Sequence, residues 1–183
     1  MKKQSLLFAF TLCSLMAVSC KKNVSVDVST DGTTADSSTT ADKNIATVKK
    51  MNKAYVKNDI PNIFKNHAES FTEYGDGSFE PEEFKGTDSL IVYQKEWATA
   101  FPDFKIENDK YYSDGNDVVV VSDWSGTWKG DFKGQKPTGK SFKFKDAEIY
   151  TLKDGKITSH RSIMPIKPIA ESTGFVWPTE KKK

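Results

Sequence analysis

The sequence predicts an α+β domain in which three N-terminal helices pack against an antiparallel sheet. The first half of the globular part carries apolar residues at helical spacing, such as Ile45, Val48 and Met51. The second half carries β-branched and aromatic runs, such as Val118 to Val121, separated by short turns that contain glycine. Because such turns join neighbouring strands directly, the last strands are expected to run antiparallel.

Helices are expected in three places before the long strands. The first contains residues 45–55, with Asp42 at its N-cap, and it ends at Asn58-Asp59-Ile60-Pro61. Pro61 opens a short second helix, because proline is tolerated in a first turn. A third helix begins at Thr87 or Asp88 and ends at Phe101-Pro102, because proline disfavours helical geometry at the residue before it.

Strands are expected at residues 70–74, 104–112, 117–128, 141–152 and 157–164. The turn before residue 117 contains Gly115-Asn116, and both residue types tolerate left-handed backbone geometry. The last two strands are joined by Asp154-Gly155, which supplies the positive φ values of a two-residue hairpin turn. Three consecutive antiparallel strands therefore close the domain.

Four signatures, in this order, resemble the SnoaL-like polyketide cyclase family of the nuclear transport factor 2 superfamily. They are Phe101-Pro102-Asp103, Gly126-Thr127-Trp128-Lys129-Gly130, the loop from Phe132 to Lys140, and Asp154-Gly155-Lys156-Ile157. The resemblance implies a cone-shaped α+β barrel, in which a curved antiparallel sheet packs against three N-terminal helices and leaves a cavity open at one end. Such a shell serves enzymes, binding modules and assembly domains, so the function has to be argued from its side chains.

The N-terminus has the features of a lipoprotein signal. Met1-Lys2-Lys3 precedes an uncharged run that is too short for a membrane-spanning helix. Ala17-Val18-Ser19-Cys20 resembles a bacterial lipobox, so Cys20 is the predicted lipidation site and membrane attachment point; an ordinary signal peptide is the alternative. We expect a signal at 1–19, a flexible tether at 20–43, the domain at 44–166 and a tail at 167–183, which is either extended or folded over the cone. The expected location is the cell envelope, facing the periplasm.

Composition limits the chemistry. Cys13 and Cys20 are the only cysteines, so the sequence predicts neither a disulfide framework nor a thiolate metal site. His67 and His160 are the only histidines and lack metal-ligand spacing, so no metal or cofactor is predicted; a protonated His67 is expected to favour the end of a helix. Without Lys2 and Lys3 the 27 basic residues become 25, against 25 acidic ones, which gives no electrostatic case for nucleic acid.

Asp123 and His160 are the candidate catalytic residues. Strand alternation places either Asp123 or Trp124 toward the interior, and an inward Asp123 would have a raised pKa suited to acid–base chemistry. The alternative is that Asp123 lies on the solvated face. Asp146 and Glu148 share a strand face with Tyr150, and this face is either the pocket wall or the outer surface.

The last strand departs from the pattern of the resembled family. There Ile-x-Glu-x-Trp is followed by an acid–base aspartate. Here Ser159 stands at the glutamate position and Arg161 at the tryptophan position, and Ser162 and Pro165 stand where the aspartate is expected. Arg161 would bind an anionic ligand if it faced inward, and an ion pair with Asp146 or Glu148 is the favoured interpretation. The aromatic residues that fill the core or line the pocket are Tyr74, Trp97, Trp124 and Trp128.

The missing aspartate favours a domain that binds a small, partly apolar molecule or a partner protein without turnover. One alternative is an acid–base enzyme of the cyclase, isomerase or hydratase type, with Asp123 or His160 as base and Tyr74 or Arg161 stabilising an enolate. Another is a homodimeric scaffold whose cone is filled by Trp97, Trp124 and Phe144. An open cavity with a buried carboxylate would favour the enzyme.

Overall fold

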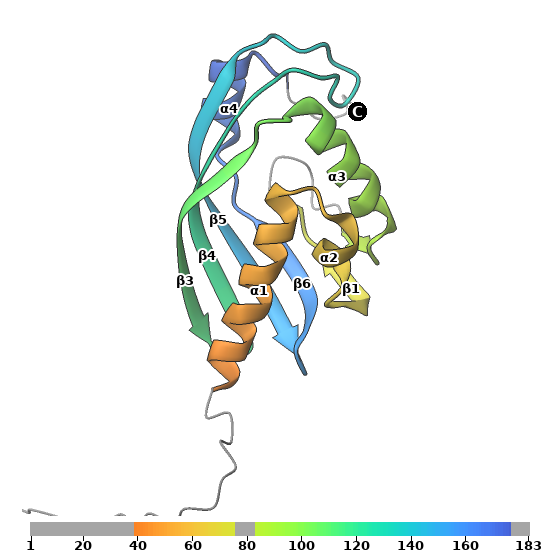
Figure 1. Ribbon diagram of the computed structural model, residues 1–183, viewed down its shortest axis with the longest axis vertical. Coiled ribbons are helices and arrows are strands. Elements are labelled where there is room, and N and C mark those ends of the chain that lie inside the picture. The colour runs from red at the N-terminus through yellow and green to blue at the C-terminus, as the bar shows by residue number, and fades with distance from the viewer. Residues whose placement is uncertain (1–38, 76–82, 177–183) are drawn as a thin grey trace, which may run out of the picture. The chain divides into compact units, whose positions relative to one another are not determined.

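The computed structural model describes residues 39–75 and 83–176 (Figure 1). The helices are α1 (Thr40–Val56), α2 (Ile60–Phe64), α3 (Asp88–Ala100) and α4 (Ile166–Thr173). The strands are β1 (His67–Glu73), β2 (Phe84–Lys85), β3 (Lys105–Asp114), β4 (Asp117–Thr127), β5 (Ser141–Lys153) and β6 (Lys156–Ser162). The predicted lipobox lies outside the described residues. Among the described helices, none has both the length and the apolar character that crossing a membrane requires.

A single six-stranded sheet has the order β2-β1-β6-β5-β4-β3. Its long strands curve around α1, as Figure 1 shows, which confirms the expected α+β arrangement. The sheet is mixed rather than wholly antiparallel, because β1 runs parallel to β6 and places Glu73 beside His160. All other pairs of neighbouring strands are antiparallel.

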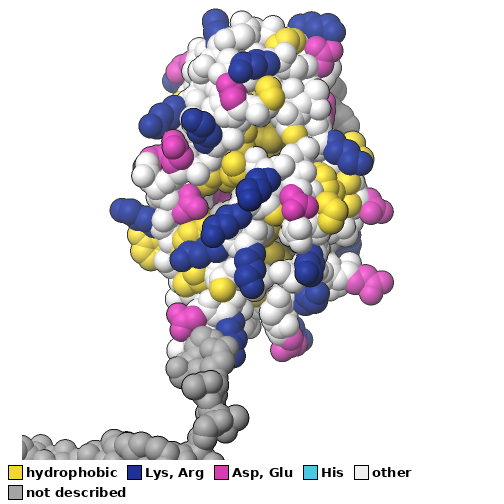
Figure 2. Space-filling model, in the orientation of Figure 1, with side chains coloured by type: hydrophobic (Ala, Val, Ile, Leu, Met, Phe, Trp, Pro, Cys, Tyr) yellow, Lys and Arg dark blue, Asp and Glu magenta, His cyan; other side chains and the backbone are white. Residues whose placement is uncertain are grey.

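Helix α1 begins with a capping box. The Thr39 hydroxyl accepts from the Asp42 backbone N–H at 3.1 Å, and the Asp42 carboxylate accepts from the Thr39 N–H at 3.0 Å. The predicted N-cap at Asp42 is therefore three residues too late. The inner side of the helix buries Val48, Met51 and Ala54. Its outer side carries the exposed lysines Lys43, Lys49, Lys50, Lys53 and Lys57. Figure 2 shows Lys and Arg side chains gathered across this face of the molecule.

Alternate residues of β4 lie on opposite faces of the sheet, and Trp124 rather than Asp123 is on the buried face. Val118, Val120, Ser122 and Trp124 are buried, as is Trp128 just after the strand. The alternate residues Val119, Val121, Asp123, Ser125 and Thr127 are partly exposed. On β5 the buried set contains Asp146, Glu148 and Tyr150, which lie opposite Ser122, Val120 and Val118. The face that was predicted to be either pocket wall or outer surface is therefore the inner one.

Two hydrophobic clusters pack against the inner face of the sheet. The first is built mainly of aromatic rings, including Trp97, Phe101, Trp124 and Phe144, and α4 covers it with Ile169 and the following Phe175. The second lies between α1 and the strands and contains Val48, Phe71, Val118 and Leu152. Residues 166–176, whose expected state was left open, thus fold onto the aromatic cluster.

The second glycine of the Gly-Thr-x-x-Gly signature, Gly130, is required by close packing. The backbone N–H groups of Lys129 and Gly130 donate to the Ala100 carbonyl at 2.8 and 3.1 Å, so this loop lies against the end of α3. A Cβ atom on Gly130 would lie 2.4 Å from the Thr99 carbonyl oxygen, closer than a Cβ approaches such an atom. Only glycine allows this approach without displacing the backbone.

Candidate functional site

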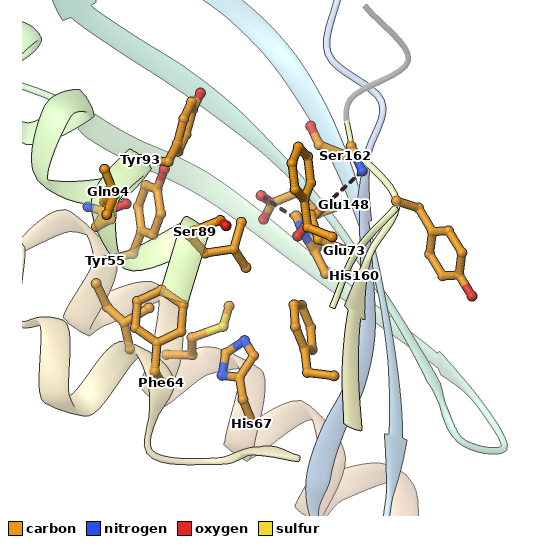
Figure 3. A pocket seen from close by; sticks show the side chains of 18 of the residues that line it. Tyr55, Phe64, His67, Glu73, Ser89, Tyr93, Gln94, Glu148, His160 and Ser162 are labelled. Carbon is orange, nitrogen blue, oxygen red and sulfur yellow. Dashed lines mark hydrogen bonds and ion pairs between the residues drawn. The ribbon is translucent and has the colours of Figure 1, made fainter. Parts of the chain in front are cut away.

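A cavity of about 510 Å³ lies between the helices and the inner face of the sheet (Figure 3). Helices α1, α2 and α3 contribute Tyr55, Phe64, Tyr93 and Gln94, and the strands contribute a wall of polar and aromatic side chains. The volume is that of a small-molecule pocket, and most of its lining is apolar.

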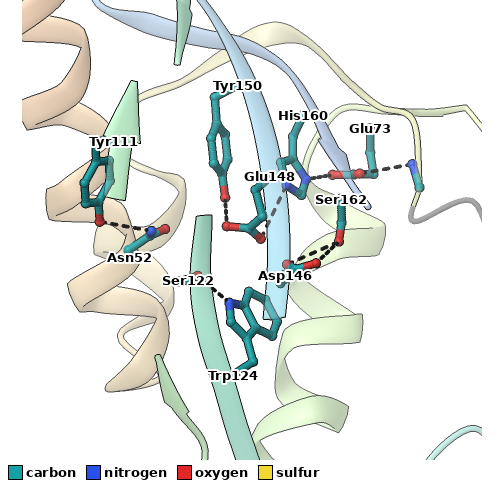
Figure 4. Close-up of polar contacts among 11 residues, drawn as sticks. Asn52, Glu73, Tyr111, Ser122, Trp124, Asp146, Glu148, Tyr150, His160 and Ser162 are labelled. Carbon is teal, nitrogen blue, oxygen red and sulfur yellow. Dashed lines mark hydrogen bonds and ion pairs between the residues drawn. The ribbon is translucent and has the colours of Figure 1, made fainter. Parts of the chain in front are cut away.

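A chain of charged contacts runs along the strand wall (Figure 4). His160 Nδ1 lies 2.7 Å from Glu73 Oε2, and His160 Nε2 lies 3.6 Å from Glu148 Oε1. The Tyr150 hydroxyl donates to Glu148 Oε2 at 2.8 Å, and the Tyr150 and His160 rings stack with centroids 4.5 Å apart. We call Glu73, Glu148, Tyr150 and His160 the carboxylate–imidazole cluster.

The sheet register brings this cluster together. Glu73 on β1 and Tyr150 on β5 are both Cα partners of His160 on β6, one on each side. Backbone contacts fix the β1 end, because the Tyr74 N–H donates to the His160 carbonyl at 2.9 Å and the Gly75 N–H donates to Glu73 Oε1 at 3.1 Å. Side chains from distant parts of the sequence therefore meet at defined atoms.

The cluster holds His160 as an imidazolium. Burial opposes its charge, but the carboxylates of Glu73 and Glu148 outweigh burial and raise the pKa of His160 to about 10. Near neutral pH both ring nitrogens therefore carry protons. Nδ1 donates to Glu73, whereas Nε2 is buried without a hydrogen-bond partner.

A third carboxyl lies behind the cluster. Asp146 is 1% exposed, and burial together with the neighbouring Glu148 raises its pKa to about 7. The Ser162 hydroxyl, which lines the cavity, lies 3.4 Å from Asp146 Oδ1 and donates toward it. Asp146 is therefore linked to the cavity through Ser162.

His67 lies in the floor of the cavity between two aromatic rings. Its ring centroid is 5.2 Å from that of Phe64 and 4.6 Å from that of Phe71. Burial, with a smaller effect of the His160 charge, lowers the pKa of His67 to about 4, so the ring is neutral near pH 7. The expectation that His67 is a protonated residue at a helix end is therefore wrong.

Two of the predicted site residues lie on the outer face of the sheet. Asp123 forms an ion pair with Lys145 and accepts a hydrogen bond from Asn108 at 2.8 Å, so this candidate base does not line the cavity. Arg161 places its guanidinium 4.9 Å from the centre of the Tyr74 ring. The predicted ion pair between Arg161 and Asp146 or Glu148 is wrong, because strand alternation places Arg161 outside and both carboxyls inside.

The predicted aromatic residues divide between pocket and core. Tyr74 and Trp124 border the cavity. Trp97 and Trp128 are 5% and 1% exposed and belong to the aromatic cluster, so neither of them lines the cavity. The Trp124 indole faces inward because its Nε1–H donates to the buried Ser122 hydroxyl at 2.9 Å.

Sequence reasoning missed several polar residues of the site, among them Glu73 and Gln94. Glu73 shares a strand face with Phe71, and this alternation within the expected strand 70–74 was a signal that could have found it. Gln94 lies one helical turn from both Leu90 and Trp97, on the face assigned to the core. Within residues 39–75 and 83–176, no group of His, Cys, Asp and Glu side chains is arranged to hold a metal ion.

This chain belongs to the SnoaL-like polyketide cyclase family, whose pattern matches residues 45–165. The match begins within α1 and includes α2, α3, β1 to β6 and the residues that line the cavity, whereas α4 lies after it. No curated protein sequence matches the chain.

Solved structures with the same fold come from several bacteria. AclR, a candidate hydroxylase from Streptomyces galilaeus, is 22% identical with a TM-score of 0.61, over 70% of this chain and 93% of AclR. A candidate SnoaL-like polyketide cyclase from Jannaschia sp. CCS1 is 18% identical with a TM-score of 0.66, over 73% and 93%. IdmH, a candidate polyketide cyclase from Streptomyces antibioticus, is 19% identical with a TM-score of 0.58, over 70% and 96%. At these identities the likeness establishes the fold.

Proposed function

We propose that the domain binds a small, largely apolar molecule in the cavity and holds the polar part of this molecule against the carboxylate–imidazole cluster. The observation that carries the proposal is a 510 Å³ cavity with aromatic walls and one buried ionic group. Trp97, Trp124 and Phe144 pack together in the aromatic cluster and leave this space open, which speaks against the filled scaffold.

Binding is tested by closing the cavity from its edge. Ser89 is exposed at the start of α3 and lines the cavity, so Ser89→Trp adds bulk without disturbing buried packing. Lys95→Trp, at an exposed position of the same helix outside the lining, is the matched control. We expect native mass spectrometry of the full chain purified from its own host to show a retained small molecule in the wild type and in Lys95→Trp, and to show its loss in Ser89→Trp. Equal retention in both variants would contradict the proposal.

Proton transfer on a bound carbonyl compound is the second candidate function, because the imidazolium of His160 and the carboxyl group of Glu148, 3.6 Å apart, both belong to residues that line the cavity. His160 is protonated, so its Nε2–H serves as a hydrogen-bond donor to a developing enolate oxygen rather than as a base. Glu148 Oε1 would take the proton from the carbon beside the carbonyl and return it to the enolate carbon. The roles differ from the sequence-based hypothesis, in which Asp123 or His160 was the base.

The catalytic candidate is tested with 4-acetylbiphenyl in deuterated buffer, where NMR follows deuterium exchange into the acetyl methyl group. We expect exchange that Glu148→Gln removes and that Arg161→Gln, on the outer face, leaves unchanged. If the ketone binds but its methyl group exchanges no faster than in buffer alone, this proton transfer is excluded and only the binding function remains.

We also propose that Cys20 is acylated and anchors the domain to the bacterial envelope, based on Ala17-Val18-Ser19-Cys20 and the tether that follows. Metabolic labelling with an alkyne fatty acid should mark the wild type and the control Cys13→Ala, but not Cys20→Ala. Labelling of Cys20→Ala, or an unlabelled wild type in the membrane fraction, would contradict the anchor.

Homodimerisation through the outer sheet face is proposed from the exposed apolar side chains at the sheet, among them Tyr112 on β3 and Ile163 directly after β6, which are 56% and 55% exposed. Sedimentation of the purified protein should give a dimer, and Ile163→Lys should give a monomer. A monomeric wild type would contradict it.

A further inference from the structure

The strand wall of the cavity presents one donor and one acceptor that do not satisfy each other. His160 Nε2 and Glu148 Oε1 are 3.6 Å apart, which is too far for a direct hydrogen bond, and Nε2 is buried without a partner. The other end of each group is fixed, because Nδ1 is bonded to Glu73 and Oε2 accepts from Tyr150. Both residues line the cavity, and their two free atoms lie side by side.

A hydroxyl group fits this place better than other polar groups. Its oxygen can lie about 2.8 Å from both atoms, accept from the Nε2–H and donate to Oε1. A carboxylate cannot donate to Glu148, and an ammonium group cannot accept from His160. Charge acts in the same direction, because the cluster holds two carboxylates against one imidazolium and therefore repels anions.

A second unsatisfied atom lies on the helix wall. Gln94 is 2% exposed and lines the cavity, and its Oε1 is buried without a partner. The amide is oriented by Nε2, which lies 3.5 Å from Asn58 Oδ1. Figure 3 shows Gln94 on the helix side, across the cavity from Glu148 and His160. An acceptor at this position calls for a donor on the ligand.

We propose that the ligand is a neutral, largely apolar molecule with two hydroxyl groups, one that bridges His160 and Glu148 and one that donates to Gln94. The inference rests on the proposed binding function and adds the chemical class of the ligand. Each hydroxyl satisfies an atom that is otherwise buried without a partner, and the aromatic walls take the body between them.

The test uses four biphenyls that differ only at their ends: biphenyl, 4-hydroxybiphenyl, 4,4′-dihydroxybiphenyl and biphenyl-4,4′-dicarboxylate. Titration calorimetry on the full chain carrying Cys20→Ala, which avoids detergent, gives the four affinities. We expect each hydroxyl to increase affinity about tenfold, as a hydrogen bond to a buried group does, and the dicarboxylate not to bind.

Gln94→Leu separates the two hydroxyl sites. It removes the acceptor while keeping similar bulk, so the dihydroxy compound should fall about tenfold, to the affinity of 4-hydroxybiphenyl, while biphenyl is unchanged. Lys95→Leu, at the exposed neighbouring position, should keep the wild-type order.

The outcomes distinguish the two proposals. If biphenyl binds as tightly as the dihydroxy compound, or the dicarboxylate binds best, the hydroxyl inference is overturned while the binding pocket stands. If Gln94→Leu weakens all four compounds equally, its role as a hydroxyl acceptor is overturned. If no compound binds and Ser89→Trp retains the same native adducts as the wild type, the binding function fails and the inference fails with it.

Discussion

Replacing His160 by glutamine should remove a pH-dependent part of the stability of the domain. The ring holds its proton because of Glu73 and Glu148, and its pKa rises from 6.5 to about 10. A raised pKa means that the stabilisation is fully present below about pH 6.5 and is lost as the pH rises through about 10. Between about pH 7 and pH 9.5 the folded state then binds nearly one proton more than the unfolded state.

The magnitude follows from the proton linkage. At about 1.36 kcal/mol for each pH unit, the free energy of unfolding should fall by roughly 3 kcal/mol across this range. His160→Gln leaves two carboxylates without their cation, which costs about 3 kcal/mol near pH 6, as for other broken buried pairs. The difference between wild type and variant should therefore shrink toward zero as the pH approaches 10.

Urea unfolding followed by tryptophan fluorescence at about pH 6, 7, 8 and 9 measures this difference. Arg161→Gln changes the neighbouring residue on the outer face, so its curve should run parallel to that of the wild type. A difference between wild type and His160→Gln that stays constant with pH would refute the argument that the cluster holds a proton on His160.

Three further predictions concern the floor of the cavity, the Gly130 contact and the C-terminal cover. Burial lowers the pKa of His67 to about 4, so the wild type should lose roughly 2 kcal/mol of stability as the pH falls from 6.5 to about 4.5, and His67→Leu should lack this loss in urea unfolding. Gly130→Ala places a Cβ 2.4 Å from the Thr99 oxygen and should destabilise the domain by about 1–3 kcal/mol, seen as a lower Tm; an unchanged Tm would contradict the close approach. Phe175→Ala should cost about 3 kcal/mol because the ring is 5% exposed, whereas Val176→Ala, at 68% exposure, should stay within about 0.5 kcal/mol; equal effects would contradict the packing of this segment.

The sequence carried enough information to predict the elements of the fold. Helical spacing, the Asp154-Gly155 turn and strand alternation are local features. The structure contains the helices, the turn and the strands that they predict. The error at Asp42 is also local, since an acidic side chain at N3 can be mistaken for the cap itself when Thr39 three residues earlier is overlooked.

The face of each strand and the partner of β1 could not be predicted in the same way. Alternation grouped Glu148 with Tyr150 correctly, but only packing against the helices decides that this group faces inward. Likewise, nothing local to the expected strand at 70–74 indicates that it pairs in parallel with the last strand. The carboxylate–imidazole cluster depends on that pairing, so sequence motifs alone could not predict it.

The parallel pairing of β1 with β6 also determines how late in synthesis the carboxylate–imidazole cluster can form. Glu73 and His160 are separated by 87 residues, and every long strand of the sheet is synthesised between them. Contacts of such high sequence separation form late, after the loop entropy of the intervening chain has been overcome. A nascent or truncated chain that ends before β6 would have helices and a partial sheet but no charged wall. Completion of the last strand is thus the step that places His160 against Glu73 and forms the charged wall of the cavity.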